Sequence, residues 1–147
     1  MDGYAGPLEA VSHVIELAVA PVFLLTAIGT LIGVLSNRLA RIVDRARVLL
    51  ERLETVPDDR KPDIQAELAT LHRRRHLVNL AITFGTTTAL FVCLLIAFAF
   101  TAAMLKLDAN LPVAALFVVA MLTFIATLVL FLREILVAVT STRMDLF

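Results

Sequence analysis

Three long runs without a charged residue most limit what this chain can fold into. They cover residues 17–37, 77–105 and 109–132. An α-helix rises about 1.5 Å per residue, so roughly 20 residues cross a hydrocarbon core of roughly 30 Å. A buried helix of a soluble bundle would show a polar residue every third or fourth position, and residues 90–100 show none. The sequence therefore predicts three transmembrane helices.

The composition excludes several other classes of protein. Hydrophobic residues make up 60% of the 147 positions and charged residues only 18%, against about 45–50% and about 25% in ordinary soluble domains. A single cysteine cannot form an intrachain disulfide. These values exclude a disordered chain, a disulfide scaffold and a soluble single-domain enzyme. We do not expect the first run to be a cleaved signal peptide, because no Lys or Arg precedes it.

The distribution of basic residues predicts how the chain is oriented. Ten of the 13 Lys and Arg residues lie in residues 38–75. Basic loops stay on the cytoplasmic side of a membrane. We therefore expect a multi-pass protein of the cell (inner) membrane, with the N-terminus outside, residues 38–75 inside, residues 106–111 outside and the C-terminus in the cytoplasm.

The basic segment is too regular to be a loop. Apolar residues recur in it at steps of three and four, which is typical of packed helices. Two prolines and paired aspartates interrupt the pattern in residues 55–63, so we expect one helix to end at about Glu54 and another to begin at about Pro62. The predicted fold is all-α, with three transmembrane helices and a cytoplasmic antiparallel helical hairpin between helices 1 and 2. Its expected segments are an outer collar and first span (7–36), the hairpin (37–78), the second span (79–105), an external turn (106–111), the third span (112–132) and a cytoplasmic extension (133–147).

An arginine-rich cluster at the base of this hairpin carries the strongest local chemistry. Asp44 lies three residues from both Arg41 and Arg47, so it can pair with both on one helix. An Arg fork suits carboxylate or phosphate groups. The cluster is either an ion-pair girdle that fixes the depth of the helix or a site for an anion, a lipid headgroup or another subunit. Its members are Arg38, Arg41, Asp44, Arg45, Arg47, Arg73, Arg74 and Arg75.

Two expectations concern the acids near this cluster. Asp44 is the acid that we expect to face the arginines, and we predict that it is buried between subunits. Arg133 and Glu134 follow the third span, where we expect the two to neutralise each other.

The motif Asn-Arg-x-x-Arg-Ile-Val-Asp-Arg-x-Arg in residues 37–47 follows the first span directly. With the hairpin, two further spans and the Arg133–Glu134 pair, it resembles a family of small bacterial membrane proteins catalogued as domain of unknown function 2721. The resemblance covers nearly the whole chain. It implies an integral inner-membrane protein, and it brings no catalytic or binding residues with it.

Small and hydroxyl-bearing residues mark candidate faces of the spans. The helix-packing candidates are Thr26, Gly29, Gly33, Ser36 and Gly85, in which the G-x-x-x-G spacing permits close approach of two helices. Thr83, Thr86 and Thr87 either bond to carbonyls of their own helix or line a pore. Both interpretations stay open.

Glu9, His13 and Glu16 fall on one face of the first helix, as weak candidates for a metal site. A solvated face explains them as well. We expect no metal, cofactor or nucleic acid, and no catalytic motif indicates an enzyme.

Two functions remain open at this point. The chain is expected to form a homo-oligomer in contact with the lipid bilayer and its anionic headgroups. The oligomer either encloses an ion-conducting pore, or it is a non-conducting scaffold or accessory subunit whose hairpin recruits a cytoplasmic protein.

Overall fold

The computed structural model describes residues 5–108 and 110–144, and it places the side chains of residues 12, 15, 16, 19–108 and 110–140. Its elements are α1 (Ala5–Thr55), the short 3-10 helix η1 (Asp58–Arg60), α2 (Lys61–Met104) and α3 (Asn110–Met144). Three helices are long and apolar enough to cross a membrane. The prediction of an all-helical chain with three such helices is confirmed.

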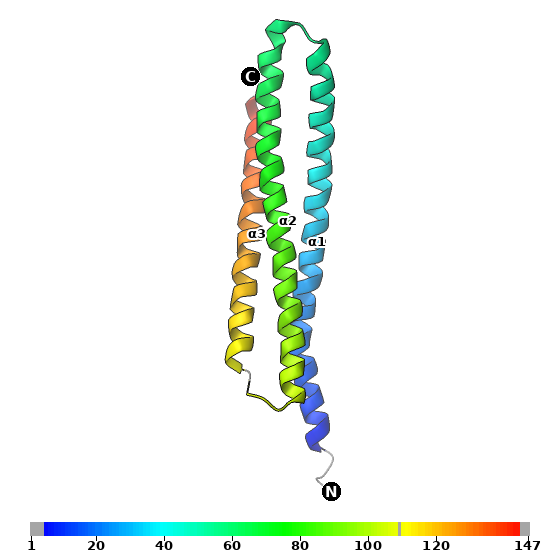
Figure 1. The fold of residues 1–147 in the computed structure, drawn as a ribbon, viewed down its shortest axis with the longest axis vertical. Helices are drawn as coiled ribbons and strands as arrows, with labels where there is room; N and C mark the ends of the chain where they lie inside the picture. The colour runs from blue at the N-terminus through cyan, green and yellow to red at the C-terminus, as the bar shows by residue number, and fades with distance from the viewer. Residues whose placement is uncertain (1–4, 109, 145–147) are drawn as a thin grey trace.

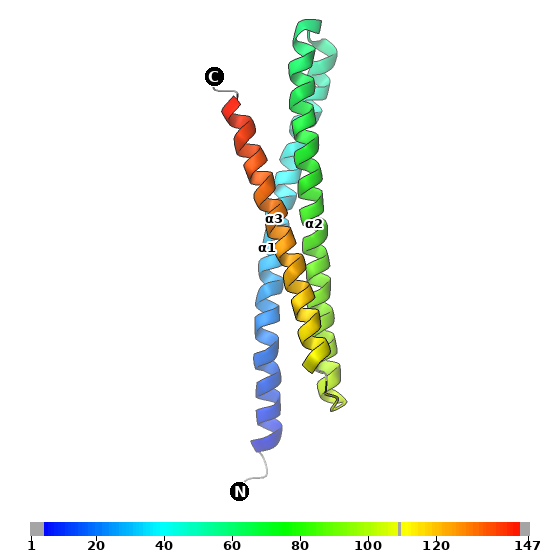
Figure 2. The ribbon, with the colours of Figure 1, turned by 90° about the vertical axis from the view of Figure 1, so that its left-hand side faces the viewer.

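The second helix forms the centre of the bundle. α2 packs along both α1 and α3 (Figure 1). α1 and α2 are antiparallel and join through the tip that contains η1, while α3 is inclined to both (Figure 2). The C-terminal half of α3 lies at the same end of the molecule as this tip, and α1 begins at the opposite end.

Buried residues recur every seven positions in all three helices. Each buried residue among the described side chains belongs to one of four series. These are Pro21, Ile28, Leu35, Ile42 and Leu49 in α1; Leu71, Val78, Gly85 and Val92 in α2; Ala81, Thr88, Leu95 and Ala102 also in α2; and Ala120, Thr127 and Glu134 in α3. A seven-residue repeat keeps one seam of a helix against its neighbour and favours left-handed winding. α2 carries two series because it has a neighbour on each side.

The hairpin tip ends one helix and starts the next with prolines. Val56 donates its backbone N–H to the carbonyl of Arg52, after which Pro57 adopts an extended conformation. Pro62 lies in the first turn of α2, where backbone N–H groups have no acceptor within the helix, so a proline costs no hydrogen bond there. α1 therefore ends at Thr55 and α2 begins at Lys61, each one residue from the position expected from the sequence.

The turn between α2 and α3 closes α2 with a Schellman motif. Leu107 donates to the carbonyl of Ala102 at 3.0 Å and Lys106 donates to that of Ala103 at 3.3 Å. Lys106 has φ of 52°, the left-handed conformation that glycine usually supplies at this position.

Gly85 is a point of close approach between helices. A Cβ placed on it would lie 3.3 Å from the side chain of Ile32 and 3.5 Å from that of Thr127. At Gly29 and Gly33 a Cβ would meet nothing within 4 Å. Within the described part of one chain the α1 stripe therefore does not meet Gly85, because Ile32 on another face of α1 lies against it.

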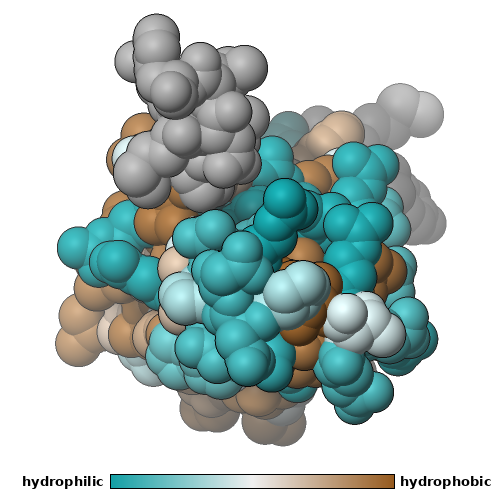
Figure 3. Space-filling model, turned by 90° about the horizontal axis from the view of Figure 1, so that it is seen from above, coloured by the Kyte–Doolittle hydropathy of each residue, from teal (hydrophilic) through white to brown (hydrophobic). Residues whose placement is uncertain are grey.

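The outer surface is apolar along the spans and hydrophilic at the end that carries the hairpin. Large apolar side chains on the spans are exposed, among them Phe23 at 71% and Leu111 at 83%. Hydrophilic residues gather over the end that carries the hairpin (Figure 3). The apolar sides require lipid or another protein chain to cover them.

Candidate functional site: an arginine pocket above a buried carboxylate

A buried carboxylate joins the three helices where the hairpin meets the spans. Glu134 is 0% exposed and occupies the third position of the buried series in α3. Its Oε2 accepts a hydrogen bond from Arg38 Nη1 of α1 at 2.6 Å. Its Oε1 accepts from Arg74 Nη2 and Nε of α2 at 2.9 and 3.2 Å. One side chain is thereby bonded to both other helices.

The side chains of the two arginines differ in their exposed fraction. The side chain of Arg74 is 21% exposed and that of Arg38 is 36% exposed. The guanidinium of Arg38 also lies over the ring of Phe131, 5.2 Å from its centroid, which is within range of a cation–π interaction. Arg38 therefore binds α3 through both charge and the aromatic face.

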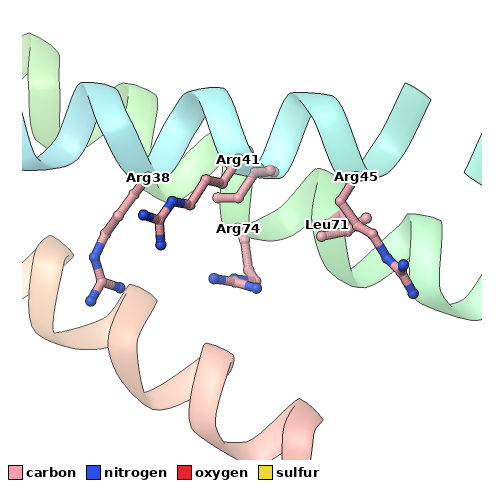
Figure 4. A pocket seen from close by; sticks show the side chains of 6 residues that line it. Arg38, Arg41, Arg45, Leu71 and Arg74 are labelled. Carbon is pink, nitrogen blue, oxygen red and sulfur yellow. The ribbon is translucent and has the colours of Figure 1, made fainter. Parts of the chain in front are cut away.

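A cavity of about 320 Å³ opens beside this ion-pair network. It is lined by Arg38, Arg41, Ile42, Arg45, Leu71 and Arg74. Figure 4 shows the side chains of Arg38, Arg41 and Arg74 extending from α1 and α2 toward the space beside α3. We call this cavity the arginine pocket.

The charges in the arginine pocket do not balance. Arg38 and Arg74 share one carboxylate, that of Glu134. Arg45 pairs with Glu67 through Nε and Nη2, each 2.8 Å from Oε1. Arg41 is exposed and makes no ion pair with any residue that the structure describes. Four guanidinium groups therefore face two carboxylates.

A comparison with protein-family models matches residues 18–144 to the family described as "Protein of unknown function (DUF2721)". The chain belongs to the DUF2721 family. The suspected resemblance is thus confirmed, and the match includes every residue of the arginine pocket. No curated protein and no solved structure gives a significant match.

The structure divides the predicted arginine cluster of this DUF2721 member into two groups. Arg38, Arg41, Arg45 and Arg74 line the arginine pocket. Arg47 and Arg75 instead border a second, mostly apolar groove of the hairpin, and Arg73 is exposed away from both. The cluster is therefore not one continuous site.

Asp44 does not act as the shared partner that its spacing predicts. It is exposed, and among the described residues it pairs with neither Arg41 nor Arg47. The carboxylate among the arginines comes from α3, because the inward face of α3 brings Glu134 beside α1 and α2.

The expected pairing of Arg133 with Glu134 is also wrong. Adjacent residues on a helix point about 100° apart, and Arg133 is exposed while Glu134 faces the core. Spacing could have identified Glu134, since it lies seven residues after Thr127 and fourteen after Ala120. The sequence predicts Glu134 only as a partner of Arg133 and not as the carboxylate of the arginine cluster.

The threonines of α2 bond first to their own helix. Thr83, Thr86 and Thr87 each donate to the carbonyl four residues earlier, at 2.8–2.9 Å. Thr88 does the same and lies 2.9 Å from the hydroxyl of Thr123 on α3. Thr83 and Thr86 are exposed on the outer face of α2.

The other candidate residues lie apart from the arginine pocket. Thr26, Gly29, Gly33 and Ser36 are all exposed along α1. Glu16 is exposed, and the side chains of Glu9 and His13 fall outside the described residues. Within the described part of the chain, no three His, Cys, Asp or Glu side chains come together as a metal site.

Replacing Glu134 with Gln is expected to destabilise the bundle by about 3 kcal/mol, because it leaves two arginines without the carboxylate between them. The measurement is the free energy of unfolding in mixed micelles. Arg133→Gln is the matched control, and at this exposed position we expect a change within about 1 kcal/mol. Equal effects of the two substitutions would show that Glu134 does not hold the helices together.

Proposed function

We propose that this protein is a non-enzymatic, homo-oligomeric membrane scaffold whose hairpin recruits a cytoplasmic protein. The observation that carries the proposal is the second groove of the hairpin, about 620 Å³ in volume. It lies between α1 and α2, shares Ile42 and Leu71 with the arginine pocket, and extends toward the hairpin tip as far as Leu50 and Gln65. We call it the hairpin groove.

The hairpin groove has an apolar floor and a basic border. Val43, Ala46, Leu50 and Leu68 supply apolar surface. Arg47, His72 and Arg75 are exposed at its border. An amphipathic helix with an apolar face and acidic flanks complements such a groove. We therefore propose a partner segment of that chemistry.

Rigid attachment to the membrane bundle supports this role. α1 and α2 continue from the spans into the hairpin without a break, and Glu134 bonds both of them to α3 at its base. A partner held in the hairpin groove would be fixed relative to the bilayer.

Oligomer formation is proposed through the small-residue face of α1. Among the described residues of one chain this face has no neighbour, since a Cβ at Gly29 or Gly33 would meet nothing within 4 Å. Small residues let two membrane helices approach closely, and lipid packs poorly into such a surface. A second copy of the chain fits this face.

An ion-conducting pore is the second candidate function. One observation favours it: Asn79, Thr83 and Thr86 are exposed along one face of α2, where a symmetric assembly could place them around an axis. The intrahelical bonds of the two threonines weaken the case, because these hydroxyls need no water or ion as partner.

The proposed location is the cell (inner) membrane, with the N-terminus outside and both the hairpin and the C-terminus in the cytoplasm. The excess of basic residues in the hairpin supports this orientation.

Recruitment is tested by photo-crosslinking in intact cells. A crosslinking residue at Leu50, which lines the hairpin groove, should capture a protein, and the same residue at the adjacent Glu51 should not. The captured peptide is expected to be amphipathic and acidic. In proteoliposomes, ion flux should equal that of empty vesicles. Flux that falls on replacing Thr83 and Thr86 with Val would favour the pore instead.

Oligomer formation is tested with Gly33→Leu. The added side chain meets open space within one chain, so helical content should be retained while the mass of the assembly in mild detergent falls. Ala97→Leu, on an exposed position of α2, is the control and should keep the wild-type mass. An unchanged mass for Gly33→Leu would exclude this face as the interface.

Orientation is tested with single cysteines in a Cys93→Ser background. An impermeant thiol reagent added to intact cells should label a cysteine at Asp108, between α2 and α3, and leave one at Asp59 unlabelled. Labelling at Asp59 from outside would reverse the proposed topology.

A further inference from the structure

The arginine pocket carries an excess of positive charge that nothing in the proposed scaffold function uses. Two of its four guanidinium groups share Glu134, a third is paired with Glu67, and that of Arg41 has no ion-pair partner among the described residues. An anion entering the pocket would meet this uncompensated charge.

The pocket also has hydrogen-bond donors to spare. Each guanidinium carries five N–H donors and no acceptor. Arg74 directs Nη2 and Nε to Glu134, which leaves Nη1, and Arg38 directs Nη1 to Glu134, which leaves Nε and Nη2. All five donors of Arg41 are without a carboxylate partner in the described structure. Several donors from two helices are therefore available to one ligand.

The ion pairs hold part of this site in place before any ligand arrives. Glu134 and the ring of Phe131 fix the position of Arg38, and Glu134 also fixes that of Arg74. On ligand binding, Arg41 is therefore the main side chain that has to lose conformational freedom. Prior positioning of donors lowers the entropic cost of binding.

The depth and size of the pocket agree with a phosphate group. Glu134 lies 24 residues after Asn110, about 36 Å along α3, and this places it just beyond a hydrocarbon core of roughly 30 Å, in the headgroup region. The cavity of about 320 Å³ has room for several water molecules and therefore for a phosphate group. Guanidinium forks match the geometry of phosphate oxygens.

We propose that Arg38, Arg41 and Arg74 form a phosphate-binding site at the inner face of the membrane. Arg41 is the principal ligand-binding residue, and the Glu134 ion pairs position the other two. Ile42 and Leu71 line the pocket and provide apolar contact beside the phosphate. The phosphate belongs either to an anionic lipid headgroup or to a free phosphate. This inference is independent of partner recruitment at the hairpin groove.

The test measures binding of three probes to the full-length protein in neutral detergent: phosphatidylglycerol, phosphatidylcholine and inorganic phosphate. Bound lipid is counted by native mass spectrometry, and inorganic phosphate is followed by the shift in melting temperature. We expect saturable binding of phosphatidylglycerol or of inorganic phosphate, weakened about tenfold by Arg41→Gln, the loss expected for hydrogen bonds to a charged group.

Arg133→Gln is the matched control, since it removes the same charge from an exposed position next to Glu134 and outside the pocket. If anionic lipid bound only through general attraction to basic residues, both substitutions would weaken its binding to the same extent. Arg41→Lys keeps the charge but not the fork, and we expect it to bind with intermediate strength. If Arg41→Gln does not fold, the Arg41→Lys variant is compared with Arg133→Gln instead.

The outcomes separate the two sources of phosphate. Retention of phosphatidylglycerol against millimolar inorganic phosphate assigns the site to a lipid headgroup, and displacement by inorganic phosphate assigns it to a free phosphate. Equal losses in Arg41→Gln and Arg133→Gln, equal binding of phosphatidylcholine and phosphatidylglycerol, or no binding of any probe would overturn the proposal. None of these results depends on whether the hairpin captures a protein.

Discussion

A carboxylate withdrawn from water is costly unless cations and hydrogen-bond donors surround it, and Glu134 meets this condition by drawing one arginine from each of the other two helices. α1 and α3 have little direct contact, since α2 lies between them. The interaction between Arg38 and Glu134 is therefore a principal link between the first and third helices. The arginine pocket depends on it, because two of the pocket's side chains are held by the same carboxylate.

Packing along the rest of the bundle follows from the size of the residues on the seven-residue series. Within the spans the series combine small residues such as Gly85, Ala81 and Ala120 with larger ones such as Ile28 and Val92. Burial of apolar surface gives no advantage over lipid, so close contact has to come from small residues that let the backbones approach. In the hairpin the buried positions of the same series, Ile42, Leu49 and Leu71, are all large and apolar.

The sequence predicts the helices well and their mutual orientation poorly, for a physical reason. The three uncharged runs and the prolines at 57 and 62 locate the helices because charge and proline act locally. In water an apolar series stands out against polar neighbours, so the hairpin seam around Ile42 and Leu49 is readable. In lipid the outward positions are apolar too, so Ile28 cannot be told from exposed Phe23 by hydropathy. For the same reason the sequence does not show which residue of α1 packs against Gly85. An ion pair between residues far apart in the chain, such as Arg38 and Glu134, produces no local sequence pattern.

The continuity of α1 has a mechanical consequence. Its 51 residues run from one end of the bundle to the hairpin tip, so no flexible joint separates the apolar span from the arm beyond it. Pro21 lies in the interior of this helix, and a proline removes one backbone bond from the ladder. A sideways load on the tip would be transmitted as bending and torque past the membrane surface toward the Pro21 region. The hairpin arm and the first span would then behave as a single lever, with its point of greatest compliance near Pro21.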